Sequence, residues 1–398
     1  MLLFPRHWLG PLCACVLSAA AAGAPAYVPA PQPVNTGRYR VGAALCPLWA
    51  GGQRWREIQP FADRKPLLGW YDEGNPEVTD WEIKWAVDHG ISFFMVCWYR
   101  EPSAAGDPAV RPGLEHWIRN GLFHARYGNQ VQFGILWDNA NREYFGKTSA
   151  EDFLGNLLPF WIHDYFSRPN YLSLDGCPVF SIFKPDKFIQ DLGGEEQTAA
   201  VLAKAREICR QAGFKNVVML GQNCWGNPAE LRRKAEQIRR VGFDATWAYH
   251  WPTFTGAFAG DLHPSGAKAI AAQEAVWQAQ LQPNPITLSM GWDEAPWHFR
   301  YSHAQWRLNP EEFETLCARA KDFLDRRPGD GIEHRLVFID NWNEFGEGHY
   351  ISPTQGAGFG YLDAVREVFA PSAGPHTDLT PSEAGLGPYD RAYRALHL

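Results

Sequence analysis

Two glutamates late in the chain have the residue types and the spacing for acid–base chemistry. Glu344 and Glu347 lie three residues apart in the segment Asp340–Tyr350, which reads DNWNEFGEGHY. On a helical turn, side chains at this spacing point to the same side, so one pocket could receive both carboxylates. Like charges held close together raise one pKa, which gives an acid and a base at the same pH. Such a pair is equipped to cleave a glycosidic bond, because one group protonates the leaving oxygen while the other assists attack at the anomeric carbon.

Other uses of these carboxylates stay open at this point. The two glutamates could be a solvated pair on a loop, or could bind a metal together with His349, although their spacing matches no strong metal motif. Asp138 or Asp293 could instead supply the second catalytic carboxylate. We expect neither a metal nor an organic cofactor.

Aromatic and polar residues recur where predicted strands end. The chain has 18 Trp but only 4 Met, and flat indole rings can stack on the C–H faces of sugars as well as fill a core. In a barrel of parallel strands, the reacting groups come from the C-terminal strand ends. We therefore predict that a carbohydrate is bound by Asn343, Trp49, Trp98, Tyr99, Trp137, Asp138, Asn223, Tyr249, His250, Trp292 and Trp342. His250 could equally be a structural histidine, and Lys184 and Arg100 could clamp an anionic group or form internal ion pairs.

The elements that must position these residues alternate along the chain. Eight apolar, β-branched or aromatic runs predict strands at Arg40–Trp49, Ile91–Tyr99, Val131–Trp137, Val179–Phe183, Val217–Gln222, Ala245–Trp251, Ile286–Trp292 and Leu336–Ile339. Amphipathic stretches predict helices at Thr79–His89, Gly113–Tyr127, Ala150–Phe166, Glu195–Ala212, Pro228–Val241, Ala267–Gln280, Pro310–Arg326 and Gly360–Phe369. Thr79, followed by Glu82, is the expected cap of the first helix. This order predicts an α/β protein with a single-domain (β/α)8 TIM barrel over residues 39–370, and no glycine-rich dinucleotide fingerprint follows the first strand.

Composition and the chain's two ends narrow the class of protein. With 398 residues, 45% of them hydrophobic, the chain can bury a sizeable core, and a net charge of −7 without a basic run argues against a nucleic-acid partner. Residues 1–24 resemble a signal peptide ending in Ala22-Gly23-Ala24, which predicts a periplasmic or secreted protein with no integral membrane segment after cleavage. Residues 25–38 form a Pro-rich leader, and residues 371–398 are expected to pack as a tail on the barrel. The six cysteines after Ala24 predict buried thiols.

The strand-eight motif resembles a known family. Asn343-Glu344-Phe345-Gly346-Glu347-Gly348, with Tyr350, Pro353 and Gly360-Tyr361-Leu362 following, is similar to the Asn-Glu-x-x-Glu-Gly signature of glycoside hydrolase family 99-like, or WbsX-like, domains. Leu68-Gly69-Trp70-Tyr71-Asp72 and Gly90-Ile91-Ser92-Phe93-Phe94 also resemble this group. Endo-α-mannosidases of the family carry Trp-His where this chain has Phe345-Gly346, so mannose as the substrate does not follow.

The resemblance implies a retaining glycosidase. It makes Glu344 the base that deprotonates a sugar 2-hydroxyl, Glu347 the general acid and then the base that activates water, and Asn343 the residue that holds a hydroxyl or orients Glu344. The sequence therefore predicts an exported glycoside hydrolase acting on a polysaccharide or glycan. The alternatives are a non-catalytic carbohydrate-binding barrel and a WbsX-like glycosyltransferase.

Overall fold

The computed structural model describes residues 27–50, 54–101, 109–140, 146–251, 258–279, 283–297 and 303–390. The predicted signal peptide, residues 1–24, lies outside these ranges, as do the first two residues of the Pro-rich leader and the last eight of the tail. No helix within the described ranges combines the length and the apolar character needed to cross a bilayer.

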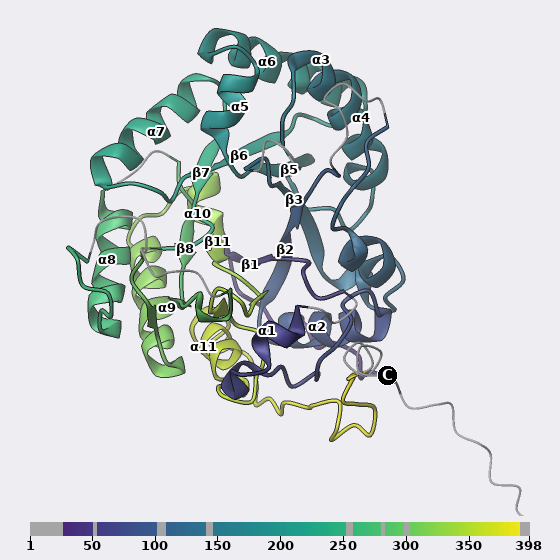
Figure 1. Ribbon diagram of the computed structural model, residues 1–398, viewed down its shortest axis with the longest axis vertical. Helices are drawn as coiled ribbons and strands as arrows, with labels where there is room; N and C mark the ends of the chain where they lie inside the picture. The colour runs from purple at the N-terminus through teal and green to yellow at the C-terminus, as the bar shows by residue number, and fades with distance from the viewer. Residues whose placement is uncertain are drawn as a thin grey trace, which may run out of the picture.

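Eight parallel strands form one strongly curved sheet at the centre of the molecule (Figure 1). In the sheet the order is β7-β6-β5-β3-β2-β1-β11-β8, so the first strand of the chain pairs with the last, as Arg40 with Leu336 shows. This is the predicted (β/α)8 barrel. Its strands are β1 (Arg40–Leu45), β2 (Ile91–Trp98), β3 (Gln132–Trp137), β5 (Cys177–Ile182), β6 (Val218–Gln222), β7 (Ala245–Trp247), β8 (Ile286–Leu288) and β11 (Leu336–Ile339).

The barrel has a seam between β7 and β8, where the described residues form no regular backbone ladder. Side chains bridge it instead. The Thr287 hydroxyl donates to the Ala248 carbonyl at 2.9 Å and accepts from its amide at 3.2 Å. The Trp251 amide donates to Ser289 Oγ at 2.6 Å. The barrel is thus nearly closed, with hydroxyl groups replacing the missing ladder bonds.

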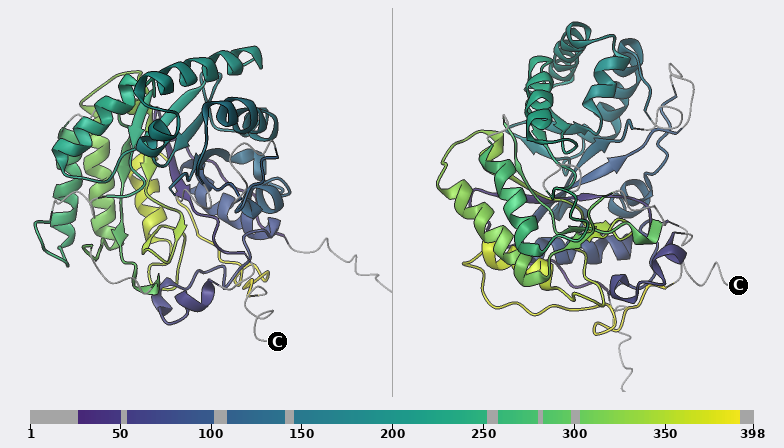
Figure 2. Two further views of the ribbon diagram at one scale, coloured as in Figure 1. Left: turned by 45° about the horizontal axis from the view of Figure 1, so that its top comes forward. Right: turned by 60° about the vertical axis from the view of Figure 1, so that its left-hand side comes forward.

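Helices surround the outside of the sheet (Figure 2). The predicted helix at 150–166 is present as alternating α and π turns. The segment predicted as a helix over 113–127 holds only one short helical stretch, η2, where Gly121 lets the chain approach Thr79 so closely that a Cβ would lie 2.4 Å from its hydroxyl. The main helices and helical turns are α2 (Pro76–Asp88), η2 (Trp117–Leu122), α3 (Ala150–Asp152), η4 (Phe153–Leu157), α4 (Leu158–Trp161), η5 (Ile162–Phe166), α6 (Glu195–Gln211), α7 (Pro228–Arg240), α8 (Gly266–Gln278), α9 (Pro310–Asp325) and α11 (Gly360–Phe369).

Shorter elements lie between these, and apart from β9, which falls within the predicted strand Ile286–Trp292, they were not predicted as separate elements. They include a short helix after β5, a strand that pairs with β5, and two small two-stranded sheets. They are α1 (Trp55–Ile58), η1 (Ala62–Arg64), η3 (Gly128–Gln130), β4 (Ser173–Leu174), α5 (Pro185–Asp191), β9 (Gly291–Trp292), η6 (Ala295–Trp297), β10 (Trp306–Arg307), α10 (Ile332–Arg335), β12 (Asn343–Glu344) and β13 (His349–Tyr350).

The first helix of the barrel, α2, begins earlier than predicted. Asn75 is its cap, and the Asn75 side chain accepts a hydrogen bond from the Glu77 amide at 3.0 Å. Pro76 then occupies the first helical position, where its missing N–H costs nothing. The prediction that Thr79 caps the helix is wrong, because Thr79 lies inside it and is fully buried.

Both described ends of the chain pack on α2. The Tyr27 hydroxyl donates to Asp80, and the Trp81 indole donates to the Tyr389 hydroxyl at 3.0 Å. The Trp85 indole donates to the Leu379 carbonyl at 2.9 Å. Residues 78–88 are all buried as a result, which is unusual for a helix on the outside of a barrel.

Candidate functional site

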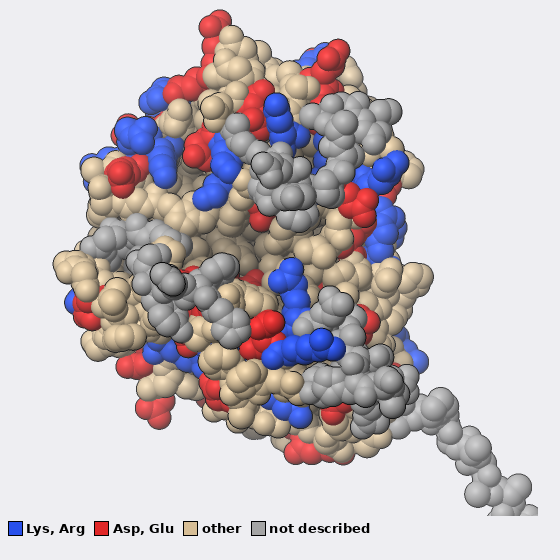
Figure 3. Space-filling model, in the orientation of Figure 1, with Lys and Arg blue, Asp and Glu red and all other residues tan. Residues whose placement is uncertain are grey.

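A pocket of about 530 Å³ opens at the C-terminal ends of the strands, a volume typical of a small-molecule site. The face drawn in Figure 3 is hollowed near its centre, with charged side chains of both signs around the hollow. Seven predicted site residues line the pocket: Tyr99, Asp138, Tyr249, His250, Trp292, Glu344 and Glu347. The sequence prediction missed seven further lining residues: Cys46, Leu48, Arg54, Cys97, Phe183, Trp225 and Trp297.

The other predicted sugar-binding residues lie behind the pocket wall: Trp49, Trp98, Trp137, Asn223, Trp342 and Asn343 are all buried and do not line the pocket. Strand alternation explains the division on β2. Cys97 and Tyr99 face the interior of the barrel, so Trp98 between them faces the helices, where its indole donates to the Tyr165 hydroxyl at 2.9 Å. Trp137 likewise packs outward, against Trp161.

Both catalytic candidates are carried by a small hairpin after β11. Asn343 and Glu344 form β12, which pairs with β13 antiparallel, so the helical turn that we expected between Glu344 and Glu347 is a hairpin turn instead. Gly348 makes this turn possible. Its φ of 74° is strained for any other residue, and a Cβ there would lie 2.8 Å from the Asp293 backbone.

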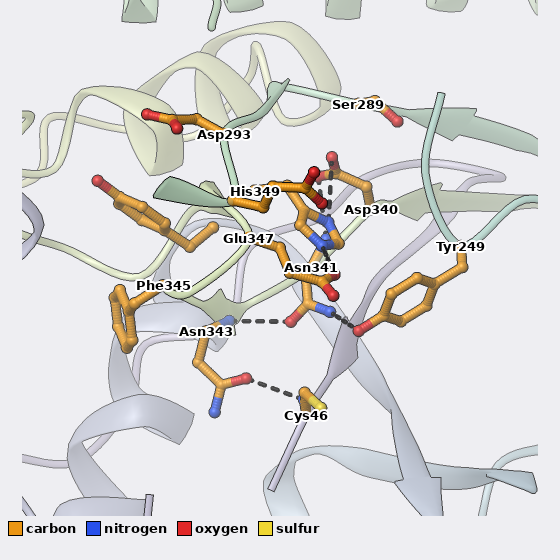
Figure 4. A network of polar contacts seen from close by, with 12 residues as sticks. Cys46, Tyr249, Ser289, Asp293, Asp340, Asn341, Asn343, Phe345, Glu347 and His349 are labelled. Atoms are coloured by element: carbon orange, nitrogen blue, oxygen red, sulfur yellow. Dashed lines mark hydrogen bonds and ion pairs between the residues drawn. The ribbon is translucent and has the colours of Figure 1, made fainter. Parts of the chain in front are cut away.

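Amide side chains fix this hairpin to the barrel (Figure 4). Asn343 Oδ1 accepts from the Cys46 amide at 2.9 Å, which joins β12 to the end of β1. Asn341 accepts from the Asn343 amide at 3.1 Å and donates to the Tyr249 hydroxyl at 2.7 Å. Asn343 thus anchors the backbone that carries Glu344 to the end of β1.

Glu344 is a buried carboxyl with unused hydrogen-bonding capacity. Its side chain is only 3% exposed, and its Oε1 atom has no hydrogen-bond partner among the described residues. Burial, the adjacent Cys46 thiol and the charge of Glu347 together raise the pKa of Glu344 well above its ordinary value. In the pocket as described, Glu344 therefore holds a proton more readily than an ordinary glutamate does.

Glu347 lies beside a histidine side chain, unlike Glu344. Its Oε2 atom lies 3.0 Å from His349 Nε2, and His349 Nδ1 lies 3.6 Å from Asp340 (Figure 4). Burial alone would lower the pKa of His349, but the two carboxylates raise it to about 10. His349 is thus an imidazolium at neutral pH, and it sets a fixed positive charge beside Glu347.

Of the other charged residues that the sequence singled out, only Asp138 lines the pocket. Burial raises the pKa of Asp138. Asp293 lies away from the pocket in an ion pair with Arg64, and Arg100 forms a buried bidentate pair with Asp152 at 2.6 and 3.1 Å. Lys184 stands over the Trp225 ring at the pocket edge.

Two further glutamates, Glu73 and Glu82, lie fully buried behind β12 and were not predicted as part of the site. Glu73 accepts from the Trp49 amide at 2.7 Å, and Glu82 accepts from the indoles of Trp117 and Trp342 at 2.7 and 3.1 Å. No local sequence signal marks them, because their contacts with Trp342 and Asn343 span 260 and 270 residues.

Comparison with known proteins places this barrel in a family. The model of the family described as "Glycosyltransferase WbsX" matches residues 59–365. Two curated relatives, both called "Uncharacterized protein WxcX" and both from Xanthomonas campestris pv. campestris, are 23% identical over 80% of this chain. The chain spans about half the length of these relatives, since the match covers 45% of each.

Solved structures share the fold at low identity. The GH99 endo-α-mannosidase of Bacteroides thetaiotaomicron superposes with a TM-score of 0.55 at 17% identity, covering 84% of this chain and 97% of that one. A structure described as "Glycoside hydrolase-like protein" gives a TM-score of 0.55 at 18% identity, covering 86% and 98%. The chain therefore belongs to the WbsX family and has the (β/α)8 barrel fold of the family 99 glycoside hydrolases.

Proposed function

We propose that this protein is an exported, retaining glycoside hydrolase that cleaves a polysaccharide or glycan with Glu344 and Glu347 as its catalytic pair. The observation that carries the proposal is the meeting of both glutamates in one pocket at the C-terminal end of the barrel, where the family motif predicts them. Aromatic side chains around the pair, among them Tyr249, Trp292 and Trp297, offer faces on which sugar rings stack.

The proposed reaction proceeds in two steps. Glu344 removes the proton of the sugar 2-hydroxyl, and that oxygen attacks the anomeric carbon while Glu347 gives a proton to the leaving glycosidic oxygen. The product of this step is an anhydro-sugar. Glu347 then takes a proton from water as the water attacks the anomeric carbon, and Glu344 returns its proton to the 2-oxygen. Both carboxyls end in their starting states, and the two inversions give net retention.

Two features of the surroundings bear directly on these roles: the open hydrogen-bonding position on Glu344 and the charge of His349 beside Glu347. The buried Glu344 has an unpartnered oxygen that a substrate hydroxyl can meet, and its raised pKa makes it a stronger base once ionised. The His349 imidazolium stabilises the negative charge that develops on Glu347 when its proton leaves for the glycosidic oxygen. This reaction uses no metal and no cofactor.

A second candidate is glycosyl transfer, because the matched family is described as a glycosyltransferase. The same carboxylate pair could pass a sugar to an acceptor hydroxyl instead of water. Hydrolysis is favoured by the signal-like N-terminus, since an exported enzyme would meet no pool of nucleotide sugars. A barrel that binds glycans without turnover is the third possibility.

One experiment separates the three activities. Purified wild-type protein and the Glu347→Gln variant are incubated with α-mannans, other bacterial and algal polysaccharides and their oligosaccharides, and released reducing ends are measured. Release by wild type but not by the variant identifies a hydrolase and its substrate class. Parallel reactions with nucleotide sugars detect transfer, and binding without release by either protein would contradict the proposed hydrolysis.

A further inference from the structure

Outside the catalytic pocket, two imidazoles and two carboxylates meet where the tail crosses the end of α2. His89 directly follows α2, Asp363 belongs to α11, and His376 and Asp378 belong to the tail. His89 is fully buried. Among the described residues, His89, His376 and Asp378 form the one group of three whose ligand atoms converge within 4.8 Å.

The ring of His89 is oriented as in a metal ligand. Its Nδ1 atom lies 2.6 Å from the Trp85 carbonyl, which as an acceptor requires a proton on Nδ1 and directs Nε2 to the cluster. The Nε2 atom is buried and makes no hydrogen bond of acceptable geometry within the described part of the chain. It lies 3.2 Å from Asp378 Oδ1 and 3.5 Å from Asp363 Oδ1.

The spacings fit a tetrahedral ion. Zinc binds nitrogen and oxygen at about 2.0 Å, so neighbouring ligands of a tetrahedral site lie about 3.3 Å apart. Besides the two distances from His89, His376 Nε2 lies 3.1 Å from the same Asp378 oxygen. Asp88, the other nearby carboxylate, is already paired with Lys84 at 2.6 Å, which leaves the charges of Asp363 and Asp378 for a divalent cation.

We propose that His89, His376 and Asp378 bind a divalent transition metal of the zinc type, with solvent as the fourth ligand, and that this ion staples the C-terminal tail to the barrel. Asp363 adds negative charge beside His89 without joining the convergent group. The proposal is independent of the catalytic function. A structural ion of this kind stabilises the folded chain because the unfolded chain does not hold the three groups together.

The test uses untagged, full-length protein, stripped with a chelator and titrated calorimetrically with Zn²⁺. We expect one ion per chain in wild type and at least a hundred-fold weaker binding in both His376→Ala and Asp378→Asn. His163→Ala, which removes an exposed histidine elsewhere, should bind as wild type does. Zn²⁺ should raise the Tm of wild type by a few degrees and leave that of His376→Ala unchanged.

Other outcomes overturn the proposal. The site is excluded if wild type binds none of Zn²⁺, Co²⁺ and Ni²⁺, or if wild type and both ligand variants bind equally well. The cluster is then only a set of ion pairs between two histidines and Asp378. Binding that leaves the Tm of wild type unchanged excludes the stapling role. Two separate ligand variants guard against misfolding of either one, which circular dichroism would detect.

Discussion

Two pairs of glutamates lie near β12, and their surroundings differ: Glu73, Glu82 and Glu344 are buried, whereas Glu347 is partly exposed. Glu73 and Glu82, behind the strand, are surrounded by fixed donors from the backbone, indoles and an imidazole. Glu344, in front of the strand, has an oxygen without a partner among the described residues, and Glu347 faces one imidazolium and the open pocket. Burial therefore does not distinguish Glu344 from Glu73 and Glu82, whereas its unused hydrogen-bonding capacity does.

The largest effect should follow from neutralising the front pair. Glu344→Gln removes the base, and we expect the cleavage rate to fall by about a hundred- to ten-thousand-fold with little change in Tm. Glu82→Gln makes the same chemical change behind β12, and its rate should stay within about ten-fold of wild type, because Glu82 does not line the pocket. A comparable loss of cleavage rate in both variants would contradict a catalytic role restricted to the front pair. The measurement is steady-state kinetics on the substrate found in the panel.

Removing a donor from the rear pair should lower stability instead. Trp117→Phe takes away the indole N–H that Glu82 accepts at 2.7 Å, leaving a buried carboxyl short of one partner. We expect a loss of about 1–3 kcal/mol in the free energy of unfolding, with the rate per folded molecule unchanged. Trp161→Phe is the matched control, because Trp161 Nε1 is buried without a hydrogen bond among the described residues. Urea unfolding of both variants gives the comparison, and equal losses would contradict it.

The rear pair should also make stability depend on pH. Burial, partly offset by the hydrogen bonds it accepts, raises the pKa of Glu82 from 4.5 to about 8. Because the folded state binds this proton more tightly than the unfolded state, the contribution of Glu82 is present below about pH 4.5 and is lost as the pH rises towards 8. Glu82→Gln should reduce that slope by up to about 1.4 kcal/mol per pH unit. An unchanged slope of unfolding free energy between pH 5 and 8, roughly the window between those two pKa values, would show that Glu82 stays ionised.

The smallest effect concerns the decrease of kcat/KM at low pH. Glu344 must be ionised to act as a base, so kcat/KM should fall as the pH drops through its raised pKa, at a higher pH than for an ordinary glutamate. Cys46→Ala removes the adjacent thiol and admits water, and should move this limb to lower pH by less than about one unit. A limb that moves upward, or does not move, would mean that another group controls it.

Much of the fold could be predicted because hydrophobic runs and caps are local signals. The strand at Leu336–Ile339 and the helix at Gly360–Phe369 have the predicted bounds. The start of α2 was missed because Thr79 and Glu82 imitate a capping box, while the Asn75-Pro76 pair a few residues earlier is the stronger start signal.

The site was harder to predict. Residues at the strand ends were selected by residue type, without asking whether each side chain faces the barrel interior or the surrounding helices. On β2 the interior residues Phe93, Met95 and Cys97 set the alternation, which assigns Tyr99 to the pocket and Trp98 to the helices. Applied to each strand, this rule would have separated pocket aromatics from core aromatics. The contacts of Glu73 and Glu82 join segments that are 270 and 260 residues apart, and they leave no local trace in the sequence.

The pairing of β1 with β11 sets a limit on the order of assembly. The first strand gains its second neighbour only when residues near 336 exist, and α2 acquires its cover from residues 379 and 389. A growing chain therefore carries an unpaired strand edge and an uncovered Trp-bearing helix until residues 336 to 389 have been made, and both are exposed to aggregation during that interval.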